Sequence, residues 1–79
     1  MKTMTCRQLG GACDKEFYAD TFEAIAKMSK DHGIEMFKIN DKPHLNAMKK
    51  MQELVKTPED FEMWLEKKRQ IFNSLPNNK

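Results

Sequence analysis

Two adjacent glycines near the start of the chain, Gly10 and Gly11, constrain its fold more than any other feature. The whole sequence contains only three glycines, so this pair marks a turn where backbone freedom is needed. Segment 3–6 precedes the pair and segment 14–19 follows it, and both contain residue types that suit β-strands. The sequence therefore predicts a β-hairpin at the front of the chain. Because an isolated hairpin is marginal in water, it must pack on a helix.

From residue 21 onward the apolar residues recur at helical spacing. Thr21 is a good N-cap for a first helix, which either ends at Gly33 or continues to about Lys38. The sequence leaves these two ends open. Residues 40–43 break the chain and start a second helix, and the pair 57–58, a cap residue followed by proline, starts a third.

The predicted element order is ββααα, an α+β fold in which a short N-terminal β-hairpin packs on three helices. We expect a single domain over residues 1–79. Within it, residues 1–38 form a ββα unit that carries cysteine and histidine, and residues 39–75 form a helical hairpin. Residues 76–79 form a frayed tail. A chain this short buries only roughly 60–65% of its unfolded surface, so its core benefits from a cross-link.

The charge balance and hydropathy argue against two classes of partner. Lysine and arginine number 14 against 12 acidic residues, a net charge of +2, so little counterion release is available and nucleic-acid binding is not expected. No apolar run approaches the roughly 20 residues of a membrane span. The N-terminus also lacks the apolar stretch of a signal peptide, which predicts a cytoplasmic location. There, two cysteines are thiols or metal ligands more often than a disulfide, although a Cys6–Cys13 bridge is sterically conceivable.

Cys6, Cys13 and His32 are the residues most capable of metal chemistry. Six residues separate the cysteines, more than the roughly two to four of most zinc motifs, but a loop with two glycines can still bring both sulfurs together. His32 lies on the inner face of the first helix, in line with Ile25 and Met36. This arrangement is typical of a zinc-finger-like site for a soft divalent ion. The alternative is two buried thiols beside a partly exposed histidine.

A family resemblance rests on the same residues. The segment Cys-Arg-Gln-Leu-Gly at 6–10, the Cys-Asp pair at 13–14, the capping Thr21 and the helical His32 follow one another in that order. This pattern resembles a family of short bacterial proteins, the domain of unknown function 1059, whose members are described as predicted small metal-binding proteins. The resemblance covers roughly residues 3–37.

The resemblance implies a metal site, with zinc as the expected ion. The ligands that it implies are Cys6, Cys13 and His32. Family members usually carry a second histidine shortly after the first, whereas this chain has Glu-Met-Phe at 35–37. The fourth ligand is therefore open among Glu35, His44, water and none. His44 stands in the first turn of its helix, just after Pro43, and is expected to be exposed.

A second function class competes with metal binding. The chain shows no acid–base pair, phosphate loop or CxxC motif, so an enzyme is not expected. It does contain seven methionines, together with Phe61 and Trp64 in the last helix. Such side chains can form an adaptable binding surface. The alternative prediction is thus a non-enzymatic interaction module that binds a protein partner or forms a homodimer through its helical surface.

Overall fold

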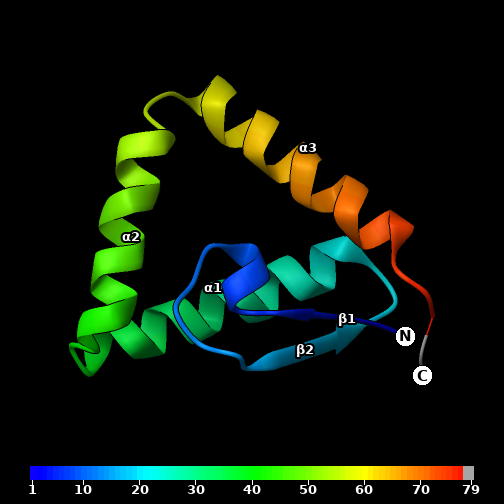
Figure 1. Cartoon of the computed structure of the whole chain (residues 1–79), viewed down its shortest axis with the longest axis horizontal. Helices are drawn as coiled ribbons and strands as arrows, with labels where there is room; N and C mark the ends of the chain where they lie inside the picture. The colour runs from blue at the N-terminus through cyan, green and yellow to red at the C-terminus, as the bar shows by residue number, and fades with distance from the viewer. Residues whose placement is uncertain (78–79) are drawn as a thin grey trace.

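The structure of the protein is a computed structural model that describes residues 1–77. It confirms the predicted order of two strands and three helices (Figure 1). The elements are β1 (Lys2–Thr5), the short 3-10 helix η1 (Arg7–Leu9), β2 (Glu16–Ala19), α1 (Phe22–Lys38), α2 (Lys42–Leu54) and α3 (Pro58–Ser74). The fold is therefore α+β, with the sheet confined to the front of the chain.

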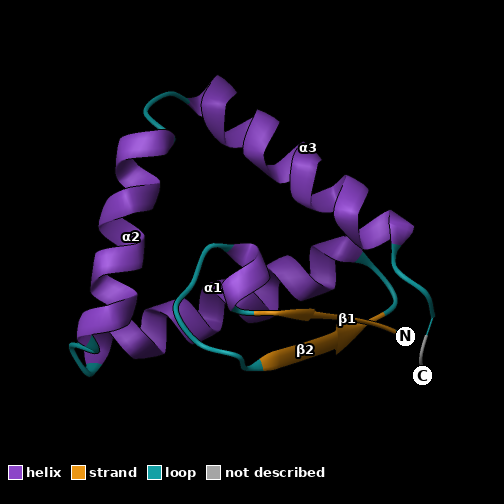
Figure 2. Cartoon of the chain, viewed as in Figure 1, coloured by secondary structure: helices purple, strands orange, loops and turns teal. Residues whose placement is uncertain are grey.

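The predicted hairpin is confirmed. β1 and β2 run antiparallel, and the residues facing each other include the pair Met4 and Phe17 (Figure 2). In β2 the alternate residues Phe17 and Ala19 are buried, as expected for a strand with one solvated face. The buried face of the hairpin packs against α1, which supplies the helix that an isolated hairpin lacks.

α1 begins where the sequence predicts and continues past Gly33. The Thr21 side chain accepts a hydrogen bond from the backbone N–H of Ala24 at 3.2 Å, which caps the first turn. The helix extends through Gly33 to Lys38, which settles the two ends left open by the sequence. One glycine inside a helix costs only about 1 kcal/mol, so packing of the helix on its neighbours can override it.

The apolar core lies between the hairpin, the start of α1 and the end of α3. Phe72 of α3 packs edge-on against Phe22 of α1, with ring centroids 6.0 Å apart. The ammonium group of Lys2 donates to the backbone carbonyls of Phe72 and Asn73, each at 3.1 Å, and so ties α3 to β1. The buried cluster comprises Met4, Cys6, Leu9, Phe17, Ala19, Phe22, Ile25 and Phe72.

α2 and α3 do not pair as the helical hairpin expected over residues 39–75. The three helices form the sides of a triangle, and α2 and α3 diverge from their link (Figure 1). α2 packs on α1, whereas α3 returns to β1. The reason is that each helix finds its buried contact elsewhere: His44 faces the loop between the strands, and Phe72 enters the core.

The expected tail at residues 76–79 is described only in part. Pro76 and Asn77 follow α3 and are exposed. The Asn77 side chain accepts a hydrogen bond from the N-terminal amino group, so this part of the tail lies beside the start of β1. Residues 78 and 79 lie outside the described residues.

Candidate metal centre

The loop between β1 and β2 brings the Cys6 and Cys13 thiols side by side. The backbone N–H of Cys6 donates to the carbonyl of Lys15 at 2.8 Å, and that of Arg7 donates to the carbonyl of Cys13 at 2.9 Å. The N–H of Gly11 in turn donates to the carbonyl of Cys6 at 2.8 Å. These bonds fold the loop back on itself and bring Cys13 beside Cys6.

Both glycines of the predicted turn are required by this loop. Gly10 has a φ of +92°, in the left-handed region that side chains disfavour, and its N–H closes η1 by donating to Arg7 at 3.2 Å. A Cβ atom at Gly11 would stand 2.1 Å from the Cys6 sulfur, so no side chain fits there. The pair therefore does more than turn the chain, because it lets the loop close over the Cys6 thiol.

Two histidines from different helices face these thiols. His32 lies on α1 and His44 in the first turn of α2, with exposed fractions of 8% and 6%. The expectation that His44 would be exposed is wrong, because α2 lies across α1 and turns this face toward the cysteine loop. A signal was present in the sequence: His44, Met48 and Met51 recur at spacings of four and three, on one face of a helix.

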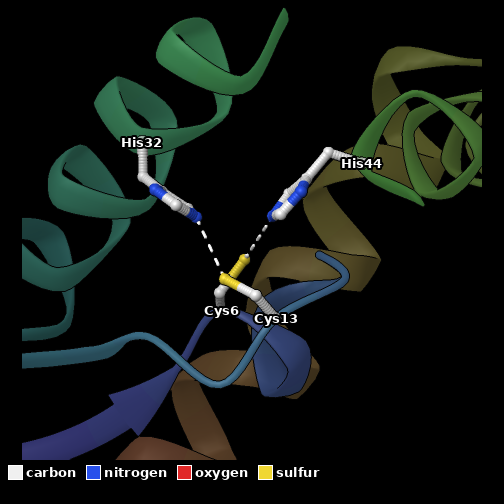
Figure 3. A group of neighbouring side chains, drawn as sticks. All are labelled: Cys6, Cys13, His32 and His44. Atoms are coloured by element: carbon white, nitrogen blue, oxygen red, sulfur yellow. Dashed lines mark hydrogen bonds between the residues drawn. The ribbon is translucent and has the colours of Figure 1, made fainter. Parts of the chain in front are cut away.

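The four side chains form one group (Figure 3). The Cys13 sulfur lies 3.3 Å from Nε2 of His32, and the Cys6 sulfur lies 3.6 Å from Nε2 of His44. One ligand atom from each residue lies within 4.8 Å of the other three. Bonds of about 2.0–2.3 Å to a tetrahedral ion would put the ligand atoms about 3.3–3.8 Å apart, so this group fits a metal ion.

The three residues predicted from the sequence are thus brought together. Of the options that were left open for the fourth ligand, His44 is the one that joins them. Glu35 is exposed and lies outside the group. Both cysteines are free thiols, so the conceivable Cys6–Cys13 disulfide is not formed in this structure. Cys6, Cys13, His32 and His44 together could bind a metal with two sulfur and two nitrogen atoms.

Asp41 orients the His44 ring. Its Oδ2 atom lies 2.5 Å from Nδ1 of His44 and also accepts a hydrogen bond from the His44 backbone N–H at 3.2 Å, which caps α2. A proton on Nδ1 that is donated to Asp41 leaves the lone pair on Nε2, directed at Cys6. These hydrogen bonds from His44 also hold the pKa of the Asp41 carboxyl below its ordinary value. The carboxylate is therefore placed as an outer-shell partner of a metal ligand.

Burial favours the neutral forms of two of the four ligands. It raises the pKa of the Cys6 thiol, and the neighbouring Cys13 side chain raises it further. Burial also lowers the pKa of His32, with the charges of His44 and Lys15 acting in the same direction. The lowered pKa of His32 favours the neutral imidazole that binds metals, whereas a thiol such as Cys6 must release a proton to become a ligand.

The surroundings of the group are mostly apolar. A cavity of about 260 Å³ borders Cys6, His32 and His44. Its other walls include Leu9, Ala47, Met48 and Met51. On the outer side of the loop, the Arg7 guanidinium pairs with Asp14 at 3.0 Å and remains exposed to solvent. Arg7 therefore braces the loop and is not itself part of the ligand group.

No protein-family model, curated protein or solved structure matches this chain. The resemblance to the domain of unknown function 1059 therefore stays a prediction. None of the helices within residues 1–77 combines the length and the apolar character needed to cross a membrane. What is known of the site comes from its own geometry.

Proposed function

We propose that this protein is a small, non-enzymatic zinc-binding protein in which Cys6, Cys13, His32 and His44 hold one ion. The observation that carries the proposal is that ligand atoms from three separate segments lie within 4.8 Å of one another. Two thiolates and two imidazoles are a donor set that zinc prefers. Four protein ligands would fill a tetrahedral site and leave no position for a substrate, which supports a structural role.

The role that we assign to the site is to fasten α2. His44 is the only fully buried side chain that α2 contributes, and its apolar residues Leu45, Ala47, Met48 and Met51 are only half-buried, so apolar packing covers this helix incompletely. Ligation would join it to His32 of α1 and to the cysteine loop. In zinc-finger peptides the apparent free energy of zinc binding at pH 7 is about 10–16 kcal/mol, more than the roughly 3–5 kcal/mol that a small core supplies.

Two further expectations belong to this proposal. A cytoplasmic location suits the site, because free thiols persist in a reducing compartment. Membership of the domain of unknown function 1059 also suits it, since the three ligands implied by that resemblance all belong to the group. His44 would then take the place of the second histidine that family members carry on the preceding helix.

The test is metal analysis of protein that is purified without a histidine tag. We expect about one zinc per chain, and tetrahedral thiolate-to-metal absorption when cobalt replaces zinc. Cys6→Ser and Cys13→Ser should each abolish stoichiometric binding, because each removes one of four ligands. Met48→Leu is the matched control, since Met48 lines the adjacent cavity but supplies no ligand of the group.

Two results would reject the proposal. One is a metal-free protein that stays fully folded and gives no thiolate absorption with cobalt. The other is stoichiometric zinc that survives both cysteine substitutions, which would place the ion elsewhere.

Protein or self-association is the second candidate function, and a specific observation favours it. Several large apolar side chains are exposed, among them Phe61 at 46% and Met63 at 63% on α3, and Phe37 at 62% at the end of α1. Light scattering over a dilution series tests self-association. A molecular mass that stays at one chain, 9.3 kDa, at every concentration would contradict a homodimer.

A further inference from the structure

A second, larger cavity lies between α1 and α3, and none of the four candidate ligands lines it. Its volume is about 600 Å³. Its apolar lining includes Leu9 of η1, Ala26 of α1, Met51 of α2, and Phe61, Trp64 and Leu65 of α3. Pockets that hold small molecules have volumes of about 300–1,000 Å³ and mainly apolar walls. This cavity therefore has the size and lining of a small-molecule site.

One end of the cavity is bridged by a contact between the two helices. The guanidinium of Arg69 pairs with the carboxylate of Glu23 at 2.5 Å and also stands over the ring of Phe22, 5.4 Å from its centroid. Phe22 itself lines the cavity at this end. The spacing between α1 and α3 is thus set by this charged contact together with the packing of Phe72 against Phe22.

The charged side chains that line the cavity are both cationic. Lys27 and Lys30 of α1 both line it, and the described residues that line it include no carboxylate. Lys27 is paired with Asp31 at 3.2 Å. Lys30 is exposed and has no acidic partner within residues 1–77. An apolar chamber with an unneutralised ammonium group complements a ligand that is itself apolar along its body and anionic at one end.

We propose that this cavity binds a small amphipathic carboxylate, of the class of medium-chain fatty acids. The hydrocarbon chain lies against the aromatic wall formed by Phe61 and Trp64, and the carboxylate pairs with Lys30. None of the four candidate metal ligands lines this cavity, although Leu9, Ser29 and Met51 line both it and the cavity beside the metal group. It gives the exposed aromatic ring of Phe61 a ligand of defined chemistry.

Trp64 is the only tryptophan in the chain and lines the cavity, so its fluorescence reports on occupancy. We expect decanoate to change this fluorescence saturably, with the metal-loaded protein as the sample. Decyltrimethylammonium has the same chain length with the opposite charge and should bind at least about tenfold more weakly, a difference of about 1.4 kcal/mol. Acetate, which lacks the chain, should give no change.

Lys30→Glu reverses the charge at the proposed headgroup site and should weaken decanoate at least about tenfold. Lys49→Glu is the matched control, because Lys49 is exposed on α2 and does not line the cavity, and it should leave the affinity unchanged. Ala26→Leu, which fills the wall opposite Trp64, should weaken binding without changing charge. It provides a second readout if Lys30→Glu disturbs the fold.

Three outcomes would overturn the proposal. The first is no saturable change with decanoate below its micelle concentration. The second is equal binding of the cationic and anionic ligands, or equal effects of the substitutions at Lys30 and Lys49. The third is a Trp64 signal that depends on protein concentration without any ligand, which would assign the cavity to a second copy of the chain.

Discussion

α2 and α3 each bury a single side chain, but the two side chains differ in chemistry. α2 buries the imidazole of His44 among thiols, whereas α3 buries the ring of Phe72 in the apolar core. Apolar burial stabilises a contact without any other component. A polar group such as an imidazole is favourable in a buried place only when it has partners. The attachment of α3 is therefore apolar, while the attachment of α2 depends on the polar partners of His44, which in this structure are Asp41 and the Cys6 thiol.

The same contrast divides α1. Its first half places Phe22 and Ile25 in the core. Its second half places His32 in the ligand group and leaves Ile34 and Phe37 exposed. The molecule therefore has one end that is fixed by packing and an opposite corner, formed by Cys6, Cys13, His32 and His44, that the proposed metal ion would fix. Local stability should respond to different changes at these two places.

The largest expected effect comes from His44→Ala. Removing one of four ligands should weaken zinc by more than about 100-fold, beyond the loss from an outer-shell substitution. Because no other side chain of α2 is buried, its backbone amides should then exchange rapidly, while those of the hairpin and early α1 stay protected. Hydrogen exchange of the zinc-loaded and variant proteins measures this. Unchanged protection of α2 would show that packing alone holds the helix.

Phe72→Ala is the converse change at the other helix. Truncating a buried phenylalanine costs about 3–5 kcal/mol, so chemical denaturation should show a loss of that size and α3 should lose amide protection. Zinc stoichiometry should not change, because Phe72 is not in the ligand group. Ile71→Ala, at a residue that is 40% exposed, is the control and should cost much less. Loss of zinc in Phe72→Ala would mean that the two attachments are not independent.

The features that the sequence predicted correctly are local ones. The turn at Gly10 and Gly11, the cap at Thr21 and the start of α3 at Pro58 all depend on residues close together in the chain. Such signals act over a few residues, and neighbouring elements do not override them here. The hairpin and the helix that carries His32 were therefore predictable, as was their approach to each other.

The features that were missed depend on how the helices cross. The short link at 56–57 suggested that the last two helices pair, but their buried contacts lie in different parts of the molecule. The prediction that His44 is exposed is wrong for the same reason, because only the crossing of α2 over α1 turns this side chain inward. The steric need for Gly11 was also invisible, because the Cys6 sulfur approaches that position only once the loop has folded.

A smaller effect on zinc binding is expected from Asp41→Asn. This substitution separates the two roles of the Asp41 carboxylate, which caps α2 and accepts the His44 Nδ1–H. Asparagine caps helices about as well as aspartate, so the start of α2 should be retained. It cannot accept the His44 Nδ1–H as a charged carboxylate does, so zinc affinity should fall about 10–100-fold while stoichiometry persists. Competition with a chromophoric chelator measures the affinity. Asp31→Asn, which breaks an exposed pair on α1, is the control. Equal affinities in both variants would assign Asp41 to capping alone.

Without metal, the stability of the corner that contains Cys6 and His32 should depend on pH, unlike that of the apolar core around Phe72. The pKa of His32 is lowered from 6.5 by burial, so its contribution to stability is present above that value and is lost as the pH falls through the folded-state pKa. The pKa of Cys6 is raised from 9.0 by burial, so its contribution is present below that value and is lost as the pH rises through the folded-state pKa. Without metal, the corner is most stable between these two limits.

Metal binding reverses the pH dependence at Cys6, because the thiolate and not the thiol is the metal ligand. A raised pKa keeps Cys6 as a thiol near neutral pH, so each ion that binds must expel at least this one proton. Zinc affinity should therefore rise at least about tenfold per pH unit between about pH 6 and pH 8. Chelator competition at several pH values in this range measures the slope. Amide protection around Phe72, corrected for intrinsic exchange rates, should stay constant over the same range. An affinity that does not change with pH would mean that Cys6 is not a ligand, and α2 would then have to be held by packing, as α3 is.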